Sequence, residues 1–196
     1  MPFFNMRIFR KRRANGFTLI EMLAVIAIIA ILASLLIAAV TKALDSAKRT
    51  KAIAGAKQLE ASLKAYLTEY GRLPVELNAG TTDGVKTDSN TVATVVQILG
   101  NTRPQPDTDN PRGIVFLDSP MTAEGAYVDA WGNMYAIGYD GDYNGKITAS
   151  ALSSVSTLIP YGDIGGSFIV ISPGKNGVFD GDPRSRNLTD DLPSTQ

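Results

Sequence analysis

Residues 16–40 read GFTLIEMLAVIAIIAILASLLIAAV, and this stretch decides the architecture of the N-terminal part of the chain. From Met22 to Val40, 18 of 19 residues are apolar, and the single exception is Ser34. As an α-helix these residues would span about 28 Å, at about 1.5 Å per residue. That length matches the hydrocarbon core of a bilayer, which is about 30 Å thick. The stretch therefore predicts one membrane-spanning helix.

The 19 basic and 19 acidic residues of the 196-residue chain cancel overall, but they are distributed unevenly. Residues 1–16 carry five basic residues and no acidic one, whereas residues 73–196 carry 7 basic and 15 acidic residues, a net charge of −8. Because basic flanks stay in the cytoplasm, we expect the acidic part to lie across the membrane. An acidic body also argues against nucleic acid as a partner. The five basic residues are Arg7, Arg10, Lys11, Arg12 and Arg13.

The composition excludes several kinds of chemistry, because the chain contains no Cys and no His. Disulfides, Cys nucleophiles, His-based triads and Cys/His zinc sites are therefore impossible. A bound metal would need oxygen ligands, which favours Ca²⁺ or Mg²⁺. The spacing supports neither a nucleophile with a neighbouring base nor a glycine loop that binds phosphate. We therefore expect a protein that is not an enzyme.

Three simpler explanations compete for the apolar stretch. A secretory signal peptide would have a shorter apolar region, and here the helical pattern continues into residues 41–70. A plain signal anchor explains both the charges and the length. A buried helix of a soluble protein is disfavoured because the apolarity is uninterrupted. None of the three explains Glu21, which stands at the start of the run.

Glu21 is expected to have a partner. A charged side chain in an apolar span costs about 2.5–3.5 kcal/mol at the centre of the bilayer and less near the interface. A free α-amino group would neutralise this carboxylate, provided that the chain were cut just before Phe17. The position of Glu21 therefore raises the question of proteolytic processing.

The segment GFTLIE, residues 16–21, resembles the processing site of type IV pilins and of type II secretion pseudopilins. The resemblance implies that a prepilin peptidase cuts between Gly16 and Phe17 on the cytoplasmic side and methylates the new N-terminal Phe17. It also implies a role in assembly for Glu21, which becomes the fifth mature residue. In that family the carboxylate at this position meets the N-terminal amine of a neighbouring subunit.

The helix is expected to continue past the bilayer, from about Phe17 to Tyr70, with an amphipathic second half that another element must cover. Gly71 and Pro74 are expected to end it. Its apolar face comprises Leu59, Leu63, Tyr66, Leu67 and Tyr70, extended backwards by Ile53 and Ala56. The basic residues, mostly off this face, are Lys48, Arg49, Lys51, Lys57 and Lys64.

The segment after the long helix is expected to contain one short helix. Val75–Asn90 is polar and rich in Gly, Thr and Asp, which predicts a loop. Thr91–Leu99 is apolar between polar flanks and fits either a short helix or a strand. A helix is favoured, because Ser89 or Asn90 can serve as its N-cap and Gly100 can end it.

Two apolar segments of the C-terminal half, Met134–Tyr139 and Ser167–Ser172, predict strands. The expected fold class is therefore α+β with a type IV pilin-like layout: a long N-terminal helix packed on a small C-terminal antiparallel sheet with long loops. The expected divisions are a cleaved leader (1–16), a transmembrane or filament-core helix (17–40), its amphipathic continuation (41–72) and a periplasmic globular region (73–196).

The resemblance extends to three further islands. Tyr70–Pro74 resembles the Y-x-x-x-P segment of major pseudopilins, and Asp129–Tyr135 resembles their D-P-W-G-N-P-Y segment. Ser172–Gly177 is similar to their S-x-G-x-D-G loop. The chain departs from the family in having Ala38 where many members carry a kinking proline, and residues 75–125 match nothing in it.

The first candidate metal site is the loop Asp140–Ile147, whose first eight positions match an EF-hand loop. Asp140 and Asp142 occupy positions 1 and 3, Asn144 occupies position 5, and the acidic residue expected at position 12 is Ala151. The bidentate ligand is therefore missing unless another segment supplies it. The alternative is a β-hairpin turn, where Asp, Asn and Gly are favoured without a metal.

The second candidate metal site is the acidic stretch Ser172–Asp191. In major pseudopilins the equivalent loop binds a structural Ca²⁺ through backbone carbonyls and aspartates. The resemblance implies carbonyl ligands from around Pro173 and Val178. The alternative is a solvated acidic tail. The candidate side chains are Asn176, Asp180, Asp190 and Asp191.

The sequence thus favours a pseudopilin-like structural subunit of a periplasmic type II secretion filament, anchored in a bacterial inner membrane by a single span. Its expected partners are other copies of the chain, prepilin peptidase, other pseudopilins and the inner-membrane secretion platform. A type IV pilin of a surface pilus is one alternative. A signal-anchored calcium-binding module that forms no filament is the other.

Overall fold

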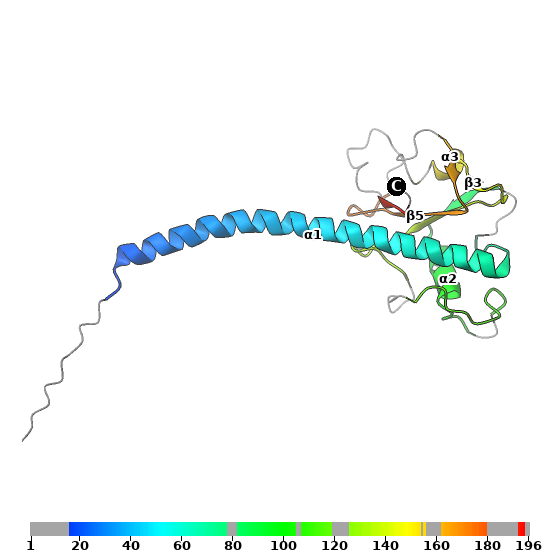
Figure 1. The fold of residues 1–196 in the computed structure, drawn as a ribbon, viewed down its shortest axis with the longest axis horizontal. Coiled ribbons are helices and arrows are strands. Elements are labelled where there is room, and N and C mark those ends of the chain that lie inside the picture. Colours follow the sequence, from blue (N-terminus) through cyan, green and yellow to red (C-terminus); the bar gives the residue numbers. More distant parts are fainter. Residues whose placement is uncertain are drawn as a thin grey trace, which may run out of the picture. The chain divides into compact units, whose positions relative to one another are not determined.

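The computed structural model describes residues 16–77, 82–104, 107–118, 126–153, 155, 162–179 and 192–194. The chain divides into two compact units, Met1–Leu44 and Asp45–Gln196. The helix α1, Leu19–Tyr70, comprises 52 residues and contributes to both (Figure 1). The described secondary structure is α+β, as the sequence predicted, with a long N-terminal helix and a small antiparallel sheet.

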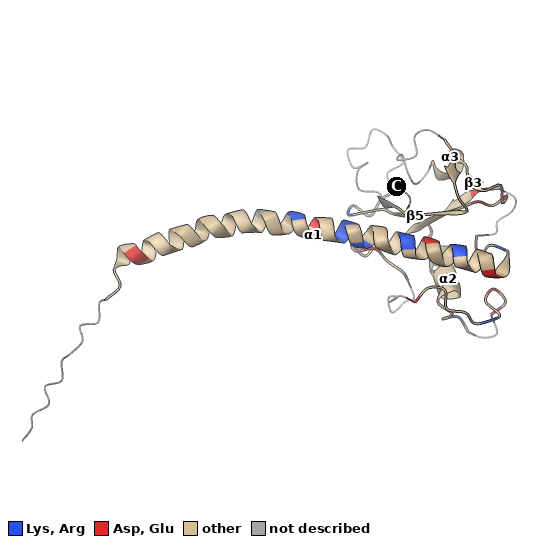
Figure 2. Cartoon of the chain, viewed as in Figure 1, with Lys and Arg blue, Asp and Glu red and all other residues tan. Residues whose placement is uncertain are grey.

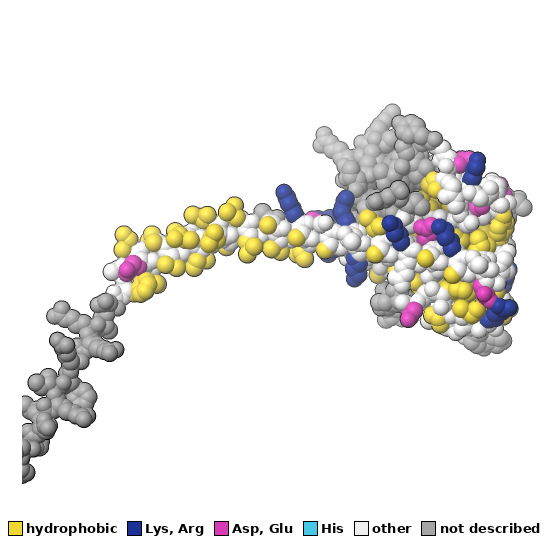
Figure 3. Space-filling model, viewed as in Figure 1, with side chains coloured by type: hydrophobic (Ala, Val, Ile, Leu, Met, Phe, Trp, Pro, Cys, Tyr) yellow, Lys and Arg dark blue, Asp and Glu magenta, His cyan; other side chains and the backbone are white. Residues whose placement is uncertain are grey.

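In the first unit, α1 is covered by exposed apolar side chains (Figure 3). Between Glu21 and Lys42 the helix carries no charged residue, and Figure 2 shows no red or blue along this stretch. Ser34 is accommodated because its hydroxyl donates to the Ile31 carbonyl at 2.7 Å. The helix runs unbroken through position 38, where many pilin-like proteins carry proline. Within the described residues, α1 alone is long and apolar enough to cross a membrane.

In the second unit, α1 buries the face that the sequence predicted. Ile53 is only partly buried, and Ala52 takes the deep position instead. Leu67 and Tyr70 pack at the edge of this core. The basic side chains point away from it and are exposed, as expected. The buried residues of this face are Ala52, Ala56, Leu59, Leu63 and Tyr66.

The sheet of the second unit has the strand order β1-β2-β5-β6, and every neighbouring pair is antiparallel. The predicted strand from Met134 begins two residues later, because Met134 forms only an isolated bridge with Val128. The predicted loop 75–90 contains the edge strand β1. The four strands are β1 (Gly84–Lys86), β2 (Ala136–Tyr139), β5 (Phe168–Ser172) and β6 (Leu192–Pro193).

Both faces of β2 and β5 are buried, because side chains alternate between two cores. Ile137 and Val170 join the core that contains the buried face of α1. Ala136 and Ile171 join a second core with Leu152. This second core is closed by the short helix α3 (Ala149–Leu152) and a two-stranded ribbon of β3 (Lys146–Ile147) and β4 (Ile164–Gly165).

The predicted short helix is α2, Ser89–Leu99, and it begins earlier than the sequence suggested. Its N-cap is Asp88, whose carboxylate accepts a hydrogen bond from the Thr91 backbone N–H at 2.8 Å. The predicted caps Ser89 and Asn90 are therefore wrong, since they are the first two helical residues. Hydrogen bonding from Thr91 lowers the pKa of Asp88. Gly100 ends the helix as predicted.

Asn110 ties the end of α1 to the segment after α2, although it is polar and fully buried. Its Nδ2 donates to the carbonyls of Ile98 and Ile114, at 3.0 and 2.8 Å. Its Oδ1 accepts from the Ile114 N–H at 3.0 Å and from the Tyr70 hydroxyl at 2.7 Å. Both the Nδ2 and the Oδ1 of this amide thus make two hydrogen bonds, and these bonds join Tyr70, Ile98 and Ile114.

We predict that Asn110→Ala lowers the free energy of unfolding by about 1–3 kcal/mol, because the partly buried Ile114 N–H and Tyr70 hydroxyl lose the oxygen that accepts their hydrogen bonds. Urea denaturation of the full chain in detergent measures this. The matched control is Asn90→Ala, on the exposed start of α2, which is expected to change stability by at most about 0.5 kcal/mol. Equal effects of the two substitutions would contradict the role of Asn110.

Candidate functional site

The segment proposed for processing lies just before α1. Gly16, Phe17 and Thr18 are exposed and not helical, and α1 starts at Leu19. The Glu21 backbone N–H donates to the Thr18 hydroxyl oxygen at 3.3 Å. In return, Glu21 Oε2 accepts from the Thr18 N–H at 2.9 Å and from its hydroxyl at 2.6 Å. This is a capping box, and it leaves the Gly16–Phe17 peptide bond outside the helix.

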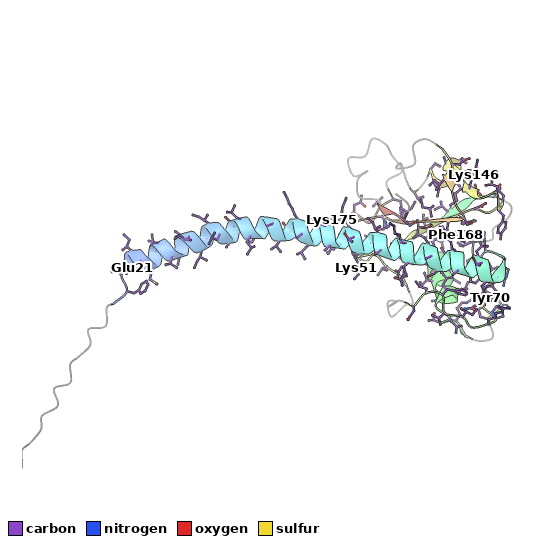
Figure 4. All side chains as sticks on the ribbon, in the orientation of Figure 1. Glu21, Lys51, Tyr70, Lys146, Phe168 and Lys175 are labelled. Carbon is purple, nitrogen blue, oxygen red and sulfur yellow. The ribbon has the colours of Figure 1, made fainter. Side chains whose placement is uncertain are left out.

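Glu21, labelled in Figure 4, lies on the first turn of α1 and its side chain is exposed. Its interaction with Thr18 is one that sequence reasoning missed. The signal was present, because Thr followed three residues later by Glu before an apolar run is the capping-box pattern. The contact with the amine of a neighbouring subunit stays a prediction.

The loop Asp140–Gly145 is built from side-chain to backbone hydrogen bonds. The two Asp140 oxygens accept from the N–H groups of Asn144 and Gly145, at 3.2 and 2.8 Å. The two Asp142 oxygens accept from the backbone and side-chain nitrogens of Asn144, at 3.1 and 2.8 Å. The loop is not the turn of a β2–β3 hairpin, because β3 pairs with β4.

A third carboxylate, Asp83, joins this loop from a distant part of the chain. Its oxygens accept from the N–H groups of Gly141 and Thr148, at 3.1 and 2.8 Å. Oxygen atoms of Asp83, Asp140 and Asp142 all lie within 4.8 Å of one another. The twelfth position of the EF-hand-like loop is Ala151 and offers no acidic ligand. Asp83 supplies an acidic group from another segment instead.

Sequence reasoning missed Asp83 because only strand pairing brings it to the loop. Gly84 pairs with Tyr139 in the β1–β2 ladder, so the residues just outside that pair, Asp83 and Asp140, are neighbours. Position 141 must be glycine where this loop passes the segment before β1, since a Cβ there would collide with the Thr82 carbonyl. The sequence carries no local signal for this register.

The second candidate metal site is only partly described. Asn176 Oδ1 accepts a hydrogen bond from the Val178 N–H at 2.9 Å, which closes a turn. Asp180, Asp190 and Asp191 lie outside the described residues. A calcium site in this stretch therefore stays a prediction.

Comparison with known proteins gives one match. The family model of the prokaryotic N-terminal methylation motif matches residues 11–37. The chain carries this motif. It indicates a prepilin-peptidase substrate of the type IV pilin and pseudopilin kind. No curated protein and no solved structure matches the chain.

Two of the islands that resemble pseudopilins lie in contact in the folded chain. Asp129 Oδ1 accepts from the N–H groups of Trp131 and Asn133, at 2.9 and 2.8 Å. Its Oδ2 accepts from the Ser172 hydroxyl at 2.7 Å. Asn133 Nδ2 donates to the Gly174 carbonyl at 2.7 Å. The island at 129–135 thus holds the start of the loop that follows β5.

We predict that co-expression with a prepilin peptidase yields a chain that starts at N-methyl-Phe17, as measured by mass spectrometry of the intact protein. Gly16→Val is expected to block the cut. A Cβ at Gly16 has no atom within 4 Å, so the substitution leaves the folded chain undisturbed and acts on recognition by the peptidase. An intact leader on the unsubstituted chain, or a cut elsewhere, would contradict the prediction.

Proposed function

We propose that the chain is a structural, non-catalytic subunit of a periplasmic type II secretion filament. The observation that carries the proposal is the methylation motif at the head of a helix whose apolar side chains are exposed, among them Leu35 at 67% and Ile37 at 66%. Exposing a large apolar side chain to water forgoes about 1.5–3 kcal/mol. This part of α1 therefore needs lipid before assembly and other helices after it.

In the proposed sequence of events, the basic leader holds the precursor in the inner membrane with its N-terminus in the cytoplasm. Prepilin peptidase removes residues 1–16 and methylates Phe17. The apolar helices of successive subunits then leave the lipid and pack side by side. The Glu21 carboxylate pairs with the Phe17 amine of the adjoining subunit, which offsets the cost of burying either charge. This pairing fixes the register between subunits.

The choice of a secretion filament over a surface pilus rests on the islands around Trp131 and Ser172 and on the absence of a cysteine pair from the sequence. The expected partners are other copies of the chain, other pseudopilins and the inner-membrane secretion platform. Immunogold labelling of cells distinguishes the two kinds of filament. Labelled filaments outside the cell under normal expression would favour the surface pilus.

We predict that Glu21→Ala preserves cleavage at Phe17 and abolishes filaments seen by electron microscopy. Glu21→Gln separates two roles of this side chain, because glutamine also serves in a capping box but carries no charge. If charge pairing sets the register, the Gln variant fails to assemble like the Ala variant. Normal filaments from Glu21→Gln would leave capping as the role of Glu21 and overturn the pairing.

We also propose that the carboxylates of Asp83, Asp140 and Asp142 take a structural Ca²⁺. Three acidic groups this close repel one another unless a cation neutralises them. Oxygen ligands from carboxylates are those that Ca²⁺ prefers. The ion would fasten the segment before β1 to the loop after β2. This proposal stands apart from the filament, and by itself it also suits an anchored calcium module.

We predict that Ca²⁺ stabilises the full chain in detergent, by about 2.7 kcal/mol at a concentration one hundred times the Kd, and that a chelator reverses the effect. Asp83→Asn is expected to remove the stabilisation. Asp163→Asn, an exposed acid outside the cluster, is expected to retain it. A melting temperature that ignores Ca²⁺, or an equal loss in both variants, would overturn the site.

A further inference from the structure

Basic residues follow the apolar run of α1 as well as precede it. Residues 41–51 carry Lys42, Lys48, Arg49 and Lys51 against a single acid, Asp45, and Figure 2 shows basic residues in blue along this part of α1. The positive-inside pattern accounts for the basic leader but not for these residues, which stand at the other end of the run. We propose that Lys42, Lys48 and Lys51 bind the phosphate groups of anionic phospholipids, in the leaflet next to the C-terminal end of the apolar run.

The three lysines are available for such binding. All three are exposed, and in the part of the chain that the structure describes no ion pair or hydrogen bond engages their ammonium groups. Asp45 precedes Lys48 by one helical turn, but its carboxylate is paired with Lys175 at 3.6 Å. Arg49 already has an interaction within the chain and is not counted among the binding residues. The lysines therefore offer positive charge to a partner outside the chain.

The lysines lie close enough to the apolar run to reach lipid headgroups. They are the second, eighth and eleventh residues after Val40, which corresponds to about 3, 12 and 17 Å of helix. The headgroup layer adds about 5–8 Å to each side of the hydrocarbon core. Long side chains of a helix point back toward its N-terminus, so Lys48 and Lys51 extend toward the apolar run. Attraction to an anionic surface then acts across the remaining gap, over a Debye length of about 8 Å.

The arrangement of the lysines around the helix favours lipid over a second protein chain. Lys42 and Lys51 are nine residues apart, about two and a half turns, so they stand on opposite sides of α1. A protein partner, such as the acidic region of a second copy, contacts one side of a helix. Headgroups surround a helix that enters a membrane. The compact charge of a lysine on its flexible stem also suits phosphate, which it binds as a point charge.

The binding has a consequence for processing, and this consequence rests on the proposed function. Cleavage before Phe17 removes all five basic residues of the leader, and residues 17–41 contain no basic residue. The mature chain thus carries basic side chains only after its apolar run. The leader holds the precursor through one leaflet, whereas the lysines hold the mature subunit through the other leaflet until assembly withdraws it.

The test uses the full, uncleaved chain in vesicles of phosphatidylcholine, with or without anionic phosphatidylglycerol. An amine-acylating reagent that does not cross membranes is added, and peptide mapping by mass spectrometry gives the rate at each lysine. The reference is Lys146, which is exposed on β3 and well apart from Lys51 within the second unit (Figure 4). Phosphatidylglycerol is expected to slow Lys48 and Lys51 about fivefold relative to Lys146, the factor for one basic residue at an anionic surface. Salt at about 1 M is expected to restore the rates, because it shortens the Debye length to about 3 Å.

The possible failures are distinguishable. Equal relative rates in the two kinds of vesicle, from a chain that has inserted, would overturn the lipid site and leave the filament proposal standing. A chain that does not insert would overturn both. Protection that rises with the density of the chain at constant lipid composition would identify a second copy as the partner and overturn the lipid site.

Paired variants of equal charge assign the effect to position. The single tryptophan, Trp131, lines the same cavity as Asp45 and Arg49, so it reports on lipids near this segment of α1. Energy transfer from it to dansyl-labelled phosphatidylglycerol is expected to exceed transfer to dansyl-labelled phosphatidylcholine. Lys48→Gln with Lys51→Gln is expected to abolish the excess, and the control, Lys57→Gln with Lys146→Gln, to retain it. The same excess in both double variants would show that overall charge, and not these lysines, attracts the lipid.

Discussion

The apolar side chains of α1 between Leu19 and Val40 impose the constraint on which the rest depends. They are exposed in the chain by itself, Leu19 at 82%, and each large one gains about 1.5–3 kcal/mol on leaving water. The backbone poses no such difficulty, since a helix satisfies its own N–H and C=O groups in an apolar medium. Only lipid or other helices can cover such a surface. In the proposed function, a membrane-inserted precursor and a filament core would provide this cover.

In the second unit, small residues of α1 allow the residues beside the sheet to pack closely against the helix. Gly55 lies beside the tyrosines that reach α1, and a Cβ there would collide with the Tyr135 hydroxyl. That hydroxyl donates to the Ala52 carbonyl at 3.1 Å, and Tyr127 stacks on the Tyr135 ring with 5.4 Å between centroids. Burial raises the pKa of Tyr135, so it stays a neutral donor. Small residues on the helix thus make room for large ones beside the sheet.

The sequence could predict those features of the fold that depend on a local pattern of residues. Helix α1 and strand β5 follow from apolar periodicity and β-branched runs, and the capping box at Thr18 was visible although it was overlooked. The N-cap of α2 is Asp88 instead of the expected Ser89 or Asn90, because several neighbouring polar residues could cap the helix equally well. Asp83 could not be placed, since only the register of β1 against β2 brings it to Asp140. Contacts between distant segments are settled by packing, which no short motif encodes.

The geometry at Glu21 shows how one carboxylate can serve two partners in the proposed filament. Both bonds from Thr18 fall on the same oxygen, Oε2, at 2.9 and 2.6 Å. The other oxygen, Oε1, makes no hydrogen bond in the described part of the chain, so capping leaves it available. Cleavage would create an amine at Phe17 of each chain, and Oε1 is the oxygen that would meet the amine of an adjoining subunit. Capping orients the acid and pairing neutralises it, and the two interactions therefore support each other instead of competing.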